Sequence, residues 1–148
     1  MILTKQVALD LMTAMKNQEK IKLDALRALK TAFILAKAET GASDLEDDAE
    51  LKIVQKLIKQ RRDSATEYAA NNRQELADKE NAEADVLMAY LPKQISADEL
   101  EKIVKEIIDS VGAVSMTDMG KVMGIASKKL AGTADGKAIS EMIKKILA

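Results

Sequence analysis

Residues 87–104 of this chain read LMAYLPKQISADELEKIV, and this stretch decides how the helices are arranged along the sequence. Pro92 is the only proline, and the residue before a proline disfavours helical geometry, so the helix that carries Leu87 should end there. Ser96, followed three residues later by Glu99, matches a capping box, in which both side chains satisfy free N–H groups at a helix start. The stretch therefore predicts one helix that ends before Pro92 and another that begins after Ser96.

Apolar residues recur at spacings of three and four on both sides of this stretch, as expected for amphipathic helices. Four such stripes precede Pro92: Val7, Leu11, Ala14, Met15; Leu26, Leu29, Phe33, Ala36; Val54, Leu57, Ile58, Ala65, Tyr68; and Ala77, Ala84, Leu87, Met88, Leu91. Three follow Ser96: Leu100, Val104, Ile107, Val111; Met119, Val122, Met123, Ala126, Leu130; and Ile139, Met142, Ile143, Ile146.

Turn and cap signals separate these stripes. Thr4 and Asp44 are candidate N-caps, Asn71-Asn72 marks a corner, and glycines follow the second, fifth and sixth stripes. The prediction is an all-α, multihelical protein with two small subdomains of about four helices each. The N-terminal subdomain should cover residues 1–92 and the C-terminal one residues 93–148.

Composition supports the helical prediction. Hydrophobic residues make up 47% of the 148 residues but aromatic residues only 2%, so the core must be built from aliphatic side chains and methionine. Sheets favour aromatic and β-branched residues, and this composition favours helices instead. A chain of this length can bury a core without disulfides or metals.

Several classes of catalytic chemistry are excluded by residue types that the sequence lacks. It contains no cysteine and no histidine, which removes thiol catalysis, the commonest general acid–base group and the commonest zinc ligand. The carboxylates Glu80, Glu83 and Asp85 have no nucleophile–base pair beside them and are interpreted as surface charge. We therefore predict no catalytic residue, no metal site and no cofactor.

A glycine-rich stretch, residues 132–138, superficially resembles a phosphate-binding loop. Its glycines are one residue too close together, Ala138 replaces the hydroxyl residue that would bind magnesium, and no strand precedes it. A turn between two helices is the better interpretation. The first 15 residues also lack a signal-peptide pattern, and no apolar run is long enough for a bilayer, so we expect a cytoplasmic protein without a membrane partner.

Two basic clusters are candidates for binding a phosphate backbone. The first is Lys52, Lys56, Lys59, Arg61 and Arg62; a solvated face with ion pairs to Asp48 and Asp63 is the favoured alternative. The second is in the tail, where Lys121, Lys128, Lys129 and Lys137 are the predicted phosphate contacts. Lys128 and Lys129 follow Lys121 by seven and eight residues, which places all three toward one side of a helix. A merely soluble basic helix is the alternative here as well.

Two further patterns have structural interpretations. Gly120 and Gly124 are four residues apart, and we expect them where two helices of the tail touch, because glycine lets backbones approach closely. The eight methionines could line an adaptable binding groove, but most lie at core spacing, so core filling is favoured.

The order of several short segments resembles the YqeY family across essentially the whole chain. They are residues 15–20 (MKNQEK) with 26–29 (LRAL), 59–64 (KQRRDS), and Lys79-Glu80 leading to Tyr90-Leu91-Pro92. Residues 119–123 (MGKVM) and 134–137 (ADGK) also resemble the C-terminal tail of GatB, a subunit of tRNA-dependent amidotransferases, over roughly residues 95–148.

The GatB resemblance implies kinship with a helical module that meets the outer body of a tRNA while another domain performs amidation. GatB relatives are classed as carbon–nitrogen ligases with glutamine as amide donor. The catalytic body of GatB, with its ATP and magnesium site and ammonia channel, has no counterpart in these 148 residues. Our first hypothesis is therefore a non-catalytic tRNA-binding or accessory module. The alternative is a helical protein–protein adaptor with no RNA role, and an enzyme in its own right is disfavoured.

Overall fold

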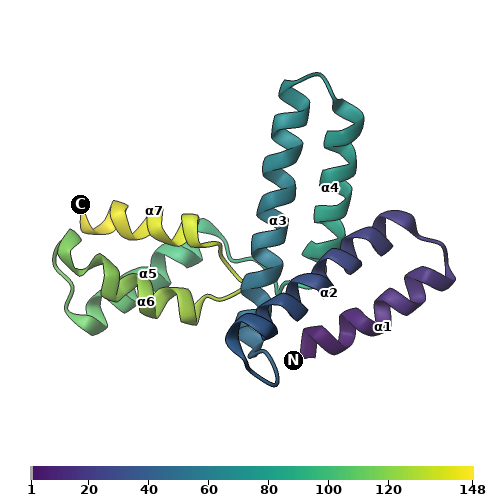
Figure 1. The fold of residues 1–148 in the computed structure, drawn as a ribbon. Helices are drawn as coiled ribbons and strands as arrows, with labels where there is room; N and C mark the ends of the chain where they lie inside the picture. The colour runs from purple at the N-terminus through teal and green to yellow at the C-terminus, as the bar shows by residue number, and fades with distance from the viewer. Residues whose placement is uncertain (1) are drawn as a thin grey trace. The chain divides into compact units, whose positions relative to one another are not determined.

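The computed structural model describes residues 2–148, which form seven α-helices, one short 3-10 helix and no strand. The chain divides into two compact units, Met1–Leu91 and Pro92–Ala148. The helices are α1 (Ile2–Lys16), α2 (Lys20–Thr40), α3 (Asp47–Ala70), α4 (Gln74–Met88), α5 (Ala97–Val111), η1 (Met116–Asp118), α6 (Met119–Lys129) and α7 (Gly136–Leu147) (Figure 1). The prediction of an all-α, multihelical fold is confirmed. That each unit is an independent subdomain stays a prediction.

The first unit is built around α2. Helices α3 and α4 lie side by side, and α1 lies along α2 (Figure 1). Fully buried side chains from all four helices meet in one core: Val7, Leu26, Leu29, Phe33, Val54 and Leu87. Each of these residues belongs to an apolar stripe predicted from the sequence, so the helical period identified the core of this unit.

The second unit packs α5, α6 and α7 together over a smaller core. Val104, Ile107, Val122, Ile139 and Ile143 are buried in it. The segment before α5 is held to this unit by its backbone and one side chain. The amide of Gln94 donates to the carbonyl of Gly132 at 2.7 Å, and the N–H of Ile95 donates to the carbonyl of Thr133 at 3.1 Å.

Most of the predicted helix ends are found in the structure. The hydroxyl of Ser96 accepts a hydrogen bond from the backbone N–H of Glu99 at 3.2 Å, as predicted for the N-cap residue of a capping box. Gly41 and Gly112 follow α2 and α5 with φ of 66° and 69°, a left-handed geometry that favours glycine. Thr4 is not the N-cap of the first helix, because α1 already begins at Ile2.

Three residues of the predicted stripes are exposed. Met15 is 54% exposed, and Tyr68 and Met88 are each 37% exposed. Periodicity shows which face of a helix is apolar but not how many neighbours cover it. Tyr68 lies in the last turn of α3, where only α4 runs beside it within the first unit (Figure 1). Across residues 2–148, no helix combines the length and apolar character that crossing a bilayer demands.

Candidate functional site

The outward face of α6 carries two of the lysines that the sequence singled out. At about 100° per residue, Lys121 and Lys128 point within about 20° of each other, and Gly124 lies between them along the helix. The opposite face carries Val122 and Ala126, which are buried in the core of the second unit. Lys121, Gly124 and Lys128 are all exposed. The helix therefore presents two cations on either side of a position without a side chain.

The expectation that Gly120 and Gly124 lie at a helix contact within the tail is wrong. A Cβ atom added at either residue would meet nothing within 4 Å. The packing side of α6 is set by Val122 and Ala126, and at about 100° per residue both glycines point well away from it. The spacing of two glycines shows that they share a face but not which face that is. Gly124 instead leaves the helix backbone open between two lysines.

The other two candidate lysines lie toward one end of α6. Lys129 is the last residue of α6, and Lys137 is in the first turn of α7. The two helices run antiparallel and are joined by residues 130–135, so Lys128, Lys129 and Lys137 lie toward the same end of the pair (Figure 1). All are exposed. Lys129 points about 100° away from Lys128 around the helix, so it flanks the outward face rather than lying on it.

The two carboxylates at the ends of the α6 segment, Asp118 and Asp135, accept hydrogen bonds from backbone N–H groups. Asp118 accepts from the N–H of Val114 at 3.0 Å, just before α6. Asp135 caps α7 by accepting from the N–H of Ala138 at 2.7 Å. Helix α6 itself contains no acidic residue, so the only charged side chains that it carries are lysines. The glycine-rich stretch is a turn between two helices, with Gly132 at φ 80°, which agrees with its interpretation from the sequence.

The first basic cluster, in α3, is largely used in ion pairs. Lys59 pairs with Asp63 at 2.7 Å, and Arg62 pairs with Asp85 of α4, also at 2.7 Å. Arg61 lies 3.3 Å from Glu83 in a nearly buried pair. These contacts support the alternative to phosphate binding, since three of the five cations are in ion pairs and two of these pairs, those of Arg61 and Arg62, join α3 to α4. Lys52 and Lys56 stay exposed.

The pair between Arg61 and Glu83 departs from the expectation of surface charge. Glu83 is buried, and burial raises the pKa of its carboxyl against the opposing effect of Arg61. The guanidinium Nε of Arg61 makes no hydrogen bond despite this contact. Asp85 is exposed, as expected. Within residues 2–148, no group of three or more acidic side chains could hold a metal ion.

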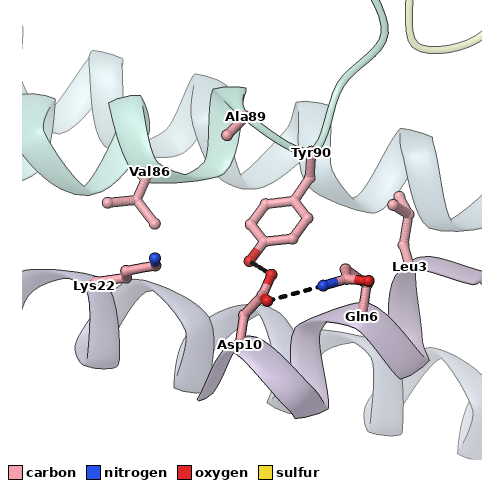
Figure 2. A pocket seen from close by; sticks show the side chains of 7 residues that line it. All are labelled: Leu3, Gln6, Asp10, Lys22, Val86, Ala89 and Tyr90. Carbon is pink, nitrogen blue, oxygen red and sulfur yellow. Dashed lines mark hydrogen bonds between the residues drawn. The ribbon is translucent and has the colours of Figure 1, made fainter. Parts of the chain in front are cut away.

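A pocket of about 530 Å³ opens in the first unit between α1, α2 and α4 (Figure 2). The hydroxyl of Tyr90 donates to the carboxylate of Asp10 at 2.5 Å, and the side-chain amide of Gln6 donates to the same carboxylate at 2.9 Å. Burial and the neighbouring Asp10 raise the pKa of Tyr90. The sequence did not indicate this network, because Asp10 and Tyr90 are 80 residues apart. The only local signal was the position of Tyr90 just before Leu91 and Pro92.

The pattern of the Yqey-like protein family matches residues 4–147, which span nearly all of both units and include the Tyr90–Asp10 contact and the outward face of α6. The chain belongs to the YqeY-like family. The resemblance to the YqeY family is therefore confirmed over nearly the whole length of the chain.

Curated relatives of this YqeY-like chain are fungal proteins named "Altered inheritance of mitochondria protein 41, mitochondrial". The Pyrenophora tritici-repentis protein is 28% identical over 141 residues, which cover 93% of this chain and 77% of the relative. The Meyerozyma guilliermondii protein is 32% identical over 121 residues, covering 78% of this chain and 63% of the relative. The Saccharomyces cerevisiae protein is 27% identical over 132 residues, covering 88% and 69%.

The names of these relatives overturn one prediction. Each is called a mitochondrial protein, so the expectation of a cytoplasmic location is wrong. The physical reason is that the amino-acid composition of a folded domain reflects the side chains needed for its core and surface, and these do not specify a compartment of the cell.

Proposed function

We propose that this YqeY-like protein is a non-catalytic tRNA-binding module, accessory to tRNA-dependent amidation. The observation that carries the proposal is the outward face of α6, where Lys121 and Lys128 stand on either side of the exposed Gly124. The resemblance of the tail to GatB suggests tRNA as the polyanion. No residue of the chain is proposed to be catalytic.

The geometry suits a phosphate backbone for two reasons. Lys121 and Lys128 are seven residues apart on α6, or about 10 Å along the helix axis, so each can neutralise a different phosphate. Gly124 adds no side chain between them, so a sugar–phosphate chain can approach the helix closely. Contacts of this kind position an RNA without reading its sequence. Lys129 and Lys137 extend the positive charge toward α7.

The test is a salt titration of tRNA binding by the parent and a triple variant, Lys121→Glu, Lys128→Glu and Lys129→Glu. Each lost phosphate contact should reduce the slope of log K against log salt by about 0.7–0.9. The variant should therefore bind more weakly at low salt and show a slope smaller by about 2, with an unchanged melting temperature.

A charge-matched control separates the α6 face from net charge. Lys20→Glu, Lys30→Glu and Lys79→Glu change three exposed lysines of the first unit that lie outside both basic clusters. This control should keep most of the parent's slope. Equal losses in both triple variants would mean that overall charge, and no particular surface, drives binding.

The adaptor alternative has one observation in its favour, the exposed apolar face of α1. Its residues Leu9 and Met12 are 60% and 64% exposed. If the parent fails to bind tRNA even at low salt, the RNA proposal is wrong and an adaptor with no RNA role becomes the better account.

A further inference from the structure

The outer face of α1 is the most apolar exposed helix surface in the first unit. Ile2, Leu9, Met12 and Met15 are 70%, 60%, 64% and 54% exposed. Leu9, Met12 and Met15 follow one another at spacings of three, so they are neighbours on the helix surface. Single exposed apolar side chains are ordinary on a protein surface, whereas a contiguous group of large ones marks an interaction site.

The inner face of α1 already has its partners. Val7, Leu11 and Ala14 are buried against the core of the first unit, and Asp10 accepts the hydrogen bond from Tyr90. Helix α1 lies along α2 (Figure 1), and these buried residues of α1 share one core with Leu29 and Phe33 of α2. The exposed apolar residues of the outer face therefore do not contribute to the packing of α1 in its own unit.

The charges on this face all have one sign. Lys5 and Lys16 are exposed and, at about 100° per residue, point within about 40° of Leu9. Asp10 is the only carboxylate of α1, and it is held on the inner side by Tyr90 and Gln6. The outer face thus combines an apolar ridge with two lysines about 16 Å apart along the helix axis.

This charge pattern argues against a second copy of the chain as the occupant. In an antiparallel pair of α1 helices, Lys5 of one copy would lie near Lys16 of the other, and in a parallel pair each lysine would face its equivalent. Like charges in such positions are unfavourable. A bilayer surface also fits poorly, because the face has no tryptophan, tyrosine or phenylalanine to anchor it.

We propose that the outer face of α1 docks an acidic amphipathic helix of another protein. The apolar stripe of that helix would pack on Leu9 and Met12, and carboxylates beside its stripe would pair with Lys5 and Lys16. Methionine side chains can adapt to the shape of such a partner. This site is separate from α6 and does not depend on RNA binding.

The test uses two fluorescein-labelled helical peptides of 18 residues. Both carry leucines at positions i, i+3, i+4 and i+7; one has glutamates beside the leucine stripe, and its twin has lysines there. Fluorescence anisotropy with the full chain should show binding of the glutamate peptide and at least about tenfold weaker binding of its twin. Equal affinity for the two peptides, or no binding of either, would overturn the proposal.

Variants locate the binding on the chain. Leu9→Gln with Met12→Gln should weaken binding of the glutamate peptide by about tenfold or more, as loss of central apolar contacts does. Ile34→Gln with Leu35→Gln is the matched control, since both residues lie on α2 and are 57% and 59% exposed. This control should bind like the parent. Equal loss in the two variants would contradict the assignment to α1.

A charge variant tests the same face without removing an apolar group. Lys5→Glu with Lys16→Glu should reverse the preference, so that the lysine peptide binds more tightly than the glutamate peptide. An unchanged preference would place the binding elsewhere. Sedimentation velocity of the free chain and flotation with vesicles of phosphatidylglycerol complete the test. If the parent self-associates or binds vesicles, and the variant Leu9→Gln with Met12→Gln does not, then the face binds a second copy of the chain or a membrane. Either result would overturn the proposal.

Discussion

Glu50 of α3 binds Thr4 of α1 through two hydrogen bonds, although the residues are 46 positions apart. The backbone N–H of Thr4 donates to the Glu50 carboxylate at 2.6 Å, and the Thr4 hydroxyl donates to the same oxygen. Glu50 is fully buried. The first N–H groups of a helix lack partners within that helix, so a carboxylate placed there satisfies them and suits the helix dipole. A side chain from α3 thus caps α1.

Replacing Glu50 should destabilise the first unit strongly. Glu50→Ala removes the buried acceptor of these partly buried donors and leaves a cavity, and should lower the free energy of unfolding by about 2–4 kcal/mol. Urea unfolding followed by tyrosine fluorescence measures this, because both tyrosines, Tyr68 and Tyr90, lie in the first unit. Glu67→Ala, at an exposed position of α3, is the control and should change stability by no more than about 0.5 kcal/mol. Similar curves for Glu50→Ala and the control would contradict a capping role.

The Tyr90–Asp10 contact predicts a fall in stability at alkaline pH. Burial and Asp10 raise the pKa of Tyr90 above its ordinary value of 10.0. The folded state therefore favours the neutral phenol, and this contribution is complete below pH about 10 and is lost as the pH rises above it. In Tyr90→Phe, the free energy of unfolding should be lower by about 1–2 kcal/mol at pH 7, and the additional loss above pH about 10 should be smaller than in the parent.

Other groups also titrate at that pH, so the comparison needs a second tyrosine variant. Tyr68→Phe is the matched control, because Tyr68 is exposed in the last turn of α3. It should keep the parent's pH dependence, measured by urea unfolding with circular dichroism. The assignment to Tyr90 fails if both variants lose stability in parallel with the parent between pH 9 and 11, a window of about one unit around the ordinary tyrosine pKa.

The pair of Arg61 and Glu83 should show strong coupling in a double-mutant cycle. Either Arg61→Met or Glu83→Leu alone leaves an unpaired, nearly buried charge and should cost about 2–4 kcal/mol. The double variant should fall within about 1 kcal/mol of the parent or exceed it, since apolar groups replace both charges. Additive losses, measured by urea unfolding, would show that the two side chains do not act as a pair.

The raised pKa of Glu83 adds a pH signature to this cycle. Its ionised form is disfavoured by burial, so at neutral pH it costs stability, and that cost is relieved as the pH falls through the raised pKa toward the ordinary value of 4.5. The double variant should lack this contribution. Its stability relative to the parent should therefore be greatest at neutral pH and decline on acidification.

Substitutions of Gly124 should not lower stability, but a large side chain at this position should weaken RNA binding. Gly124→Ala places a methyl group in open space and lowers the entropy cost of the helix, so unfolding should require about 0.5–1 kcal/mol more. Gly124→Leu should also fold normally but weaken tRNA binding, because its side chain fills the space between Lys121 and Lys128. Gly112→Ala is the contrasting control, since its φ of 69° strains any residue with a Cβ and should lower the melting temperature. Loss of stability in Gly124→Ala would mean that α6 packs on that face after all.

Helix content and most of the apolar core were determined by the sequence itself. The apolar residues at spacings of three and four put Leu29, Val54, Val122 and Ile143 on inward faces, and all four are buried. Local signals also fixed several helix ends, as at Ser96 and Gly112, because capping depends on residues within a few positions of one another.

Only the tertiary structure decided which polar groups meet. Glu50 and Thr4, Arg61 and Glu83, and Asp10 and Tyr90 come from different helices, and helical periodicity contains no information about such pairs. The same reason explains the glycines of α6. Their spacing placed Gly120 and Gly124 on related faces, but the packing of Val122 and Ala126 decided that those faces point to open space. A stripe shows where a helix is apolar; how far it is covered, as Leu9 and Met12 on α1 demonstrate, depends on the neighbours that the fold supplies.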